Sequence, residues 1–150
     1  MREVVVLGVG LHRFGKTGDA VVGTKSVTEL CRHAVDAALK DAGVSWKQIE
    51  AIAAASSRFS GGKGWGLNGN DVEEDLGSTG IPVYNMSAGC SAGGNAFNVG
   101  YNMVAGGAYD MMLVVGGEVM PKGMIQTSGI EEATDPEFLR QRCVGIPGPA

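Results

Sequence analysis

The sequence lacks a surplus of positive charge. Lysine and arginine make up 12 of its 150 residues against 16 acidic residues, so the formal net charge is -4. Proteins that bind duplex DNA usually present a basic surplus or a basic stripe to the phosphates, and this sequence has neither. Nucleic acid is therefore not expected among its partners.

Long apolar runs and cysteines are also few. No run approaches the roughly 20 apolar residues that a helix needs to cross a bilayer, so no membrane span is predicted. The chain has three cysteines, an odd number, and no signal-peptide pattern opens it, so a disulfide framework is not expected. These absences predict a reducing, cytoplasmic location.

Glycine, in contrast, is abundant. It accounts for 25 of the 150 residues, more than twice its usual share of about 7%. The glycines follow no collagen period, and 44% of the residues are hydrophobic and 19% charged. This composition favours one folded domain with tight turns and close backbone packing over a disordered chain.

The hydrophobic pattern predicts a layered α/β domain. An unbroken apolar run such as Val4–Leu7 is typical of a parallel strand that is covered on both faces. A capping box at Ser26 and Glu29 and a terminal Gly43 bound one amphipathic helix. The loop over 56–80 holds at most one further helix. The other expected elements are strands at 49–55, 82–86 and 111–115 and a helix at 92–104, whose glycines indicate a buried position.

Two phosphate-binding patterns near the N-terminus are incomplete. Residues 10–17, GLHRFGKT, match the P-loop pattern G-x-x-x-x-G-K-[ST]. A P-loop requires a helix that begins at the Lys-Thr pair, but the first expected helix begins only after Ser26. The GVGLHR sequence has Arg13 where a dinucleotide fingerprint has its third glycine. We therefore predict no nucleotide binding.

Cys90 carries the strongest chemical signal. Residues 85–94, NMSAGCSAGG, predict a strand, a turn of small residues and a helix that begins at the cysteine. The N–H groups and the positive dipole end of a helix N-terminus favour thiolate over thiol. Small neighbours leave the sulfur open to a substrate, as a nucleophile requires. From these residues alone, a small buried hydrophobic role stays open as the alternative.

The residues around Cys90 resemble the nucleophile region of thiolases. In that family a C-A-S-G-like turn precedes a helix, an A-x-G-x-x-D turn and a strand that closes in G-G-x-E-x-M. The corresponding segments here are CSAGGNAF at 90–97, AGGAYD at 105–110 and LVVGGEVM at 113–120. The resemblance extends over roughly residues 1 to 125 and is greatest to the sterol-carrier-type, or lipid-transfer-type, branch.

The resemblance implies the N-terminal half of a layered thiolase-like fold, with a mixed, mainly parallel sheet and a buried central helix. Residues 1–119 would form the N-terminal thiolase-like α/β domain. Residues 120–150 would be the start of an inserted loop region, apparently interrupted. Because thiolase folds consist of two similar halves, we expect either a fragment or a subunit that needs a partner.

The resemblance also implies a reaction. Cys90 would take an acyl group from an acyl-CoA, and the enzyme would form or cleave a 3-oxoacyl-CoA with coenzyme A thioesters as substrates and no bound cofactor or metal. Met120 and Met124 would line the acyl pocket. The family's catalytic histidines and oxyanion loop lie in the C-terminal half, so we expect no catalytic role for His12 or His33.

Three hypotheses of function remain open at this point. The first is a thiolase, and the second is a condensing enzyme of the hydroxymethylglutaryl-CoA synthase or ketosynthase type. The third is a non-catalytic thiolase-like subunit for lipid binding or assembly, which the missing histidines favour and Cys90 opposes. The resemblance further implies a homodimer or higher oligomer and allows a small OB-fold, acyl-CoA-binding partner of the DUF35 type. Cys31 is expected to be a packing residue, and Cys143 has no assigned role.

Overall fold

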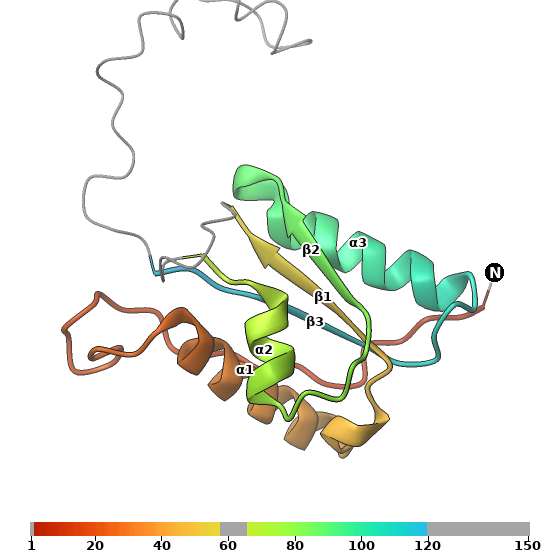
Figure 1. The fold of residues 1–150 in the computed structure, drawn as a ribbon, viewed down its shortest axis with the longest axis horizontal. Helices are drawn as coiled ribbons and strands as arrows, with labels where there is room; N and C mark the ends of the chain where they lie inside the picture. Colours follow the sequence, from red (N-terminus) through yellow and green to blue (C-terminus); the bar gives the residue numbers. More distant parts are fainter. Residues whose placement is uncertain (1, 58–65, 120–150) are drawn as a thin grey trace, which may run out of the picture. The chain divides into compact units, whose positions relative to one another are not determined.

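The computed structural model describes residues 2–57 and 66–119. Three strands form one sheet in the order β2-β1-β3, and both pairings are parallel. The helices and strands follow in the order α1 (Val27–Ala42), β1 (Ala51–Ser56), α2 (Gly69–Asp75), β2 (Val83–Ser87), α3 (Ala92–Ala105) and β3 (Met112–Gly116) (Figure 1).

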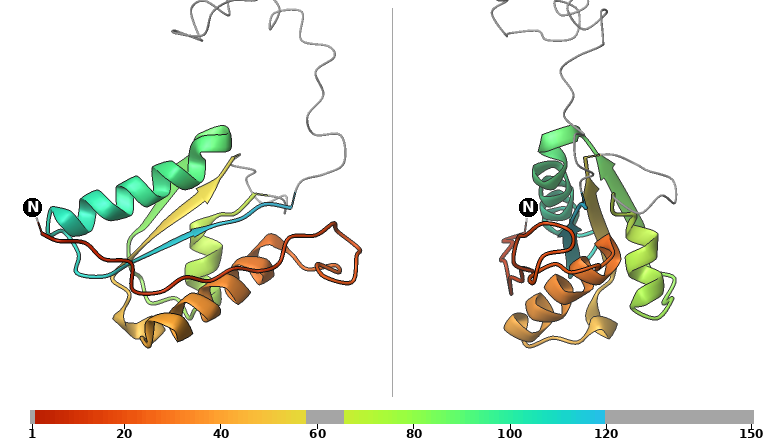
Figure 2. Two further views of the ribbon diagram at one scale, coloured as in Figure 1. Left: turned by 180° about the vertical axis from the view of Figure 1, so that it is seen from behind. Right: turned by 90° about the vertical axis from the view of Figure 1, so that its left-hand side faces the viewer.

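The sheet lies between two layers of helix. The α1 and α2 helices cover one face, and α3 runs along the other, as the end-on view of Figure 2 makes clear. The predicted layered α/β fold is confirmed. The described strands are all parallel, and the antiparallel pairing among the described residues is the single bridge between Gly66 and Glu118.

The central strand β1 explains why its sequence is so apolar. All six of its residues are buried, because it has a strand on each side and a helical layer on each face. Because its side chains alternate between the two faces of the sheet, the core has two parts. Ile52 and Ala54 pack toward α1 and α2, whereas Ala53 and Ala55 pack toward α3.

The α1 helix has the ends that its sequence predicts. The Ser26 hydroxyl accepts the N–H of Glu29 at 3.2 Å, and the Glu29 carboxylate accepts the N–H of Ser26 at 2.7 Å. Gly43 ends the helix in the left-handed region, with φ 67°, and its N–H donates back to the last turn. Glycine is the residue that adopts this conformation without a steric cost.

The expected strand at residues 4–7 is absent, so that prediction is wrong. β1 pairs directly with both β2 and β3, and residues 4–7 run as extended chain outside the sheet. Val5, Val6 and Leu7 are more than half exposed, at 64%, 62% and 53%. The segment follows α1 instead (Figure 2): the Val9 N–H donates to the Asp41 carboxylate at 2.9 Å.

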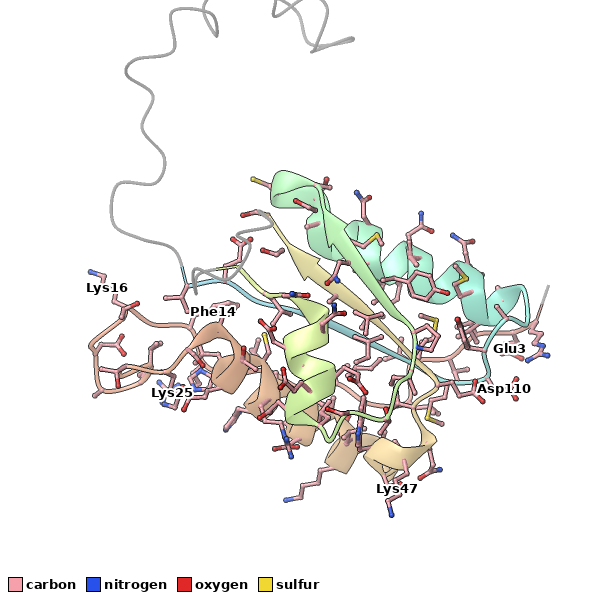
Figure 3. The ribbon with its side chains drawn as sticks, in the orientation of Figure 1. Glu3, Phe14, Lys16, Lys25, Lys47 and Asp110 are labelled. Carbon is pink, nitrogen blue, oxygen red and sulfur yellow. The ribbon has the colours of Figure 1, made fainter. Side chains whose placement is uncertain are left out.

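Glycine explains how this segment lies so close to α1. A β-carbon built on Gly8 would stand 2.5 Å from the carbonyl oxygen of Ala38, a distance that no real side chain tolerates. Figure 3 follows the segment from Glu3 to Phe14 and Lys16, which lie on its outer loop. Gly8 thus lets the chain lie against the backbone of α1, while Val5, Val6 and Leu7 before it stay largely exposed.

The α3 helix is buried on one face only, which qualifies the prediction of a buried central helix. Ala92, Ala96, Gly100 and Ala105 face the sheet and are buried, whereas the Phe97 side of the helix is open to solvent, with Phe97 52% exposed. Glycine at position 100 lets the helix approach the sheet closely, since a β-carbon there would lie 2.8 Å from the Val114 side chain.

Candidate active site

The candidate site lies where the parallel strands end. In open parallel sheets the carboxyl ends of the strands meet at one edge, which is where such folds commonly hold their ligands. β2 ends at Ser87, and a short 3-10 turn, Gly89–Ser91 (η2), leads into α3. The predicted arrangement of a strand, a tight turn with Cys90 and a helix is therefore present.

Two features shape the turn around Cys90. Gly89 is in the left-handed region with φ 55°, which lets the chain reverse between the strand and the helix. Ser91 then closes the turn, because both its N–H and its hydroxyl donate to the carbonyl of Ala88, at 3.1 and 2.7 Å. The Ser91 hydroxyl is thus occupied by the turn and does not cap α3.

Cys90 lies in this turn with its side chain exposed. Ser91 alone separates it from α3, whose first N–H groups have no side-chain cap. Such groups carry the positive end of the helix dipole and stabilise negative charge on a neighbouring atom. Cys90 stands two residues before these donors in the chain, and the described residues leave its side chain exposed.

Cys31 has the opposite environment. It lies on the inner face of α1, is 3% exposed, and burial raises the pKa of its thiol to about 12. A β-carbon built on Gly117 would stand 2.5 Å from its sulfur, so the thiol fills the space that this glycine leaves. Cys31 is a packing residue, as expected. Cys143, Met120 and Met124 lie outside the described residues.

The two histidines lie together, which the sequence does not predict. The rings of His12 and His33 meet edge to face, with centroids 4.9 Å apart and planes at 77°. His33 belongs to α1, which covers the face of the sheet opposite to α3. The pair is therefore separated from the Cys90 turn by the sheet, and it offers no base to that turn in this structure.

Glu118 is a residue of the strand ends that sequence reasoning missed. Its carboxylate accepts the N–H of Ser57 and, at 3.2 Å, the hydroxyl of Ser56. The Ser87 hydroxyl in turn donates to the carbonyl of Ser57 at 3.4 Å. The end of β1 is thus tied to the ends of both neighbouring strands. The available signal was an acidic residue placed directly after the apolar β3 run and its two glycines.

The P-loop match has no structural counterpart. Residues 17–24 form turns, and α1 begins at Val27, well after the Lys-Thr pair. Lys16 is exposed on the outer loop (Figure 3). The N–H groups of a helix start, which would cradle a phosphate in a P-loop, are therefore absent from this pair.

Comparison with known proteins decides the family. The family model described as the N-terminal domain of thiolase matches residues 4–141. This chain belongs to the thiolase family. It is 33% identical over 135 residues to sterol carrier protein 2 of Gallus gallus, which covers 90% of this chain. It is 29% identical over 138 residues to the acetyl-CoA acetyltransferase of Methanocaldococcus jannaschii, which covers 92% of it.

The thiolase relatives are much longer than this chain. It spans 23% of the chicken protein and 34% of the archaeal enzyme. Its fold is similar to that of 3-oxoacyl-[acyl-carrier-protein] synthase III from Aquifex aeolicus, with a TM-score of 0.51 over 61% of this chain and 29% of the other, at 21% identity. Among the described residues of this chain, no helix is long and apolar enough to cross a membrane.

Proposed function

We propose that this chain carries the acyl-accepting cysteine of a thiolase-type acyltransferase. The Cys90 thiolate attacks the carbonyl carbon of an acyl-CoA thioester. A new carbon–sulfur bond forms to Cys90, the bond to the sulfur of coenzyme A breaks, and coenzyme A leaves as its thiolate. The observation that carries the proposal is an exposed thiol in a tight turn at the uncapped start of α3.

The second half of the reaction needs groups beyond this turn. In condensation a second acyl-CoA loses an α-proton, its carbanion attacks the carbonyl carbon of the acyl-cysteine, and Cys90 leaves as its thiolate. In thiolysis Cys90 instead attacks the 3-oxo carbon of a 3-oxoacyl-CoA, the bond between C2 and C3 breaks, and the departing carbanion takes up a proton to give a shortened acyl-CoA; the thiolate of coenzyme A then accepts the acyl group and releases Cys90. Both steps need a base and donors for an oxyanion, each typically contributing 10²–10³-fold or more. Because His12 and His33 lie across the sheet, we propose that further chain or a partner subunit supplies the base.

The wider assignments follow the same proposal. Met120 and Met124, just beyond β3, would line the acyl pocket, since methionine adapts to flexible apolar groups. Coenzyme A thioesters would be the substrates, with no bound cofactor. A cytoplasmic homodimer or higher oligomer, with or without an OB-fold partner of the DUF35 type, would be the working form.

A lipid-binding or assembly subunit is the second candidate. Phe97, Tyr101 and Val114 are 52%, 43% and 37% exposed, which gives the α3 side an apolar surface. The name of one relative, sterol carrier protein 2, also fits lipid binding. This candidate predicts binding of a fatty acyl chain that does not depend on Cys90. A condensing enzyme of the hydroxymethylglutaryl-CoA synthase or ketosynthase type would share the acylation step and differ in its acceptor.

Acylation of the thiol separates these candidates. The chain is incubated with acetyl-CoA at neutral pH, and intact mass and peptide mapping follow the acetyl group. We expect one acetyl group on Cys90, none on Cys31, and no acetylation of Cys90→Ala, while the matched control Cys31→Ala is acetylated like the parent. An unmodified Cys90 under conditions in which iodoacetamide labels it would refute the proposal.

Turnover provides the second test. Acetoacetyl-CoA thiolysis is measured for residues 1–150 and for a longer chain or a reconstituted complex that contains the missing histidines. We expect acylation without turnover from residues 1–150. Turnover within about tenfold of the longer form would show that the base lies within these residues, against the proposal.

A further inference from the structure

Three strand ends meet at one residue beside the Cys90 turn. Ser57, just past β1, has both of its backbone groups bound: its N–H by the Glu118 carboxylate and its carbonyl by the Ser87 hydroxyl. The first partner follows β3 and the second ends β2. Ser57 therefore connects Glu118 to the strand that leads into the candidate site.

The connection reaches Cys90 within a few residues. Ser87 is separated from Cys90 only by Ala88 and Gly89, and Gly89 is the left-handed residue of the turn. A glycine resists bending less than any other residue, so it cannot by itself fix the direction of the chain. The position of the sulfur at the start of α3 then depends on how firmly the chain is held at Ser87.

The Glu118 carboxylate is suited to hold this point. It is half-buried and accepts two hydrogen bonds, from the Ser57 N–H and the Ser56 hydroxyl. Hydrogen bonds to an ionised acceptor are roughly twice as strong as those between neutral groups. We infer that Glu118 is a positioning residue, which acts through the backbone of Ser57 and through Ser87 to fix the Cys90 turn for acyl transfer.

This inference deepens the proposed function and rests on it for the chemistry at Cys90. The Glu118 carboxylate binds Ser56 and Ser57 rather than the Cys90 turn itself, so its effect on the sulfur is indirect. A misplacement of about 1 Å can reduce the rate of a positioned reaction by about a hundredfold. Because the tie passes through one intermediate residue, we expect a smaller loss, of about tenfold.

The experiment compares four chains with the parent: Glu118→Ala, Glu118→Gln, Ser87→Ala and Ser57→Ala. The rates of Cys90 acetylation by acetyl-CoA and of Cys90 alkylation by iodoacetamide are followed by peptide mapping. The buried Cys31 is followed in the same samples as an internal report on loosening of the fold. Ser57→Ala is the matched control, because the tie uses only the backbone of Ser57 and its hydroxyl has no partner among the described residues.

The expected pattern is specific to a positioning role. Glu118→Ala slows acetylation of Cys90 by about tenfold while Cys31 stays protected, and Ser87→Ala slows it less, by about threefold. Alkylation by iodoacetamide, which needs no bound pose, stays near the parent rate because the thiol remains exposed. Glu118→Gln recovers most of the rate, because its amide oxygen still accepts the Ser57 N–H. Ser57→Ala reacts like the parent.

Three results would overturn the inference. They are a parent-like rate in Glu118→Ala, a Glu118→Gln chain as slow as Glu118→Ala, and a loss at Cys90 accompanied by faster labelling of Cys31. If Glu118→Ala does not fold, the decision passes to Ser87→Ala, for which a parent-like rate overturns the inference. A parent that is alkylated but never acetylated refutes the proposed function, whereas a parent that is acetylated, with Glu118→Ala at the same rate, refutes only the role of Glu118.

Discussion

The two faces of the sheet are built from different residues. On the face covered by α1 and α2, the buried cluster is made mostly of large aliphatic side chains: Val27, Val35, Ile49, Ile52, Leu67, Val72, Leu113 and Val115. On the face covered by α3, the buried cluster consists of alanines: Ala53, Ala55, Ala92 and Ala96. The side chains of β1 alternate between the two faces, so this one strand contributes residues to both clusters.

The two faces therefore have different effects: the aliphatic face stabilises the fold, and the alanine face determines how close α3 lies to the sheet. Burial of a large aliphatic side chain stabilises a fold by about 1.5–3 kcal/mol, and an alanine contributes much less. The alanine face instead lets α3 approach the sheet closely, as the Gly100 position shows. The α3 helix, which follows the Cys90 turn, is therefore held by a close fit, and the opposite face supplies most of the hydrophobic stabilisation.

The largest loss of stability is expected from a cavity on the aliphatic face of the sheet. Ile52 is fully buried at the centre of the sheet. We expect Ile52→Ala to lower the free energy of unfolding by about 3–4 kcal/mol, because it loses burial and leaves a cavity. Urea unfolding followed by circular dichroism measures the change. The control is Val5→Ala on the exposed N-terminal segment, and a similar loss in both chains would contradict the assignment of the core.

The alanine face is tested by adding a methyl group instead of removing one. Gly100→Ala places a β-carbon 2.8 Å from the Val114 side chain, so we expect a loss of about 1–2 kcal/mol despite the better helix propensity of alanine. The double variant Gly100→Ala/Val114→Ala should recover part of this loss. A stabilised Gly100→Ala chain would mean that α3 does not lie this close to β3.

The buried thiol of the aliphatic face predicts a pH effect. The pKa of Cys31 is raised from 9.0 to about 12 by burial. Its contribution to stability is therefore fully present below about pH 9 and is lost as the pH rises toward 12, because only the unfolded state then ionises readily. We expect the urea midpoint of the parent to fall more steeply from pH 8 to 11 than that of Cys31→Ala. Parallel curves would contradict this.

The smallest effect on stability is expected on the outer side of α3. Phe97 is 52% exposed there, so Phe97→Ser should change the free energy of unfolding by about 0.5 kcal/mol or less. If this surface is covered in the working assembly, the same change weakens association, which sedimentation of the parent and the variant at matched concentrations measures. A loss above about 2 kcal/mol would place Phe97 in the core of this chain.

Local patterns in the sequence were sufficient for most of the elements. The capping box at Ser26, the terminal Gly43 and the turn that holds Cys90 each depend on neighbouring residues, and each is present as predicted. The thiolase resemblance rested on short motifs in the correct order, and the family match confirms it.

The one strand prediction that failed, and the contacts that no prediction covered, depend on residues far apart in the chain. An apolar run such as Val4–Leu7 has the same pattern whether or not it joins a sheet, and here β1 pairs with β2 and β3 while the run stays outside the described sheet. The meeting of His12 with His33, and the tie from Glu118 to Ser57, join residues far apart in the chain. No periodicity or spacing in the sequence indicates such pairs.

The order of the strands has a consequence for how the protein is made. β1 is synthesised first, yet its partners come much later, with Ile52 opposite Val83 on one side and Leu113 on the other. At about 5–20 residues per second, the ribosome delivers both partners only seconds after β1, which meanwhile has two open edges and an apolar sequence. Completion of the sheet must therefore wait for β3, and a nascent chain stalled after α3 would leave one edge of β1 open to aggregation.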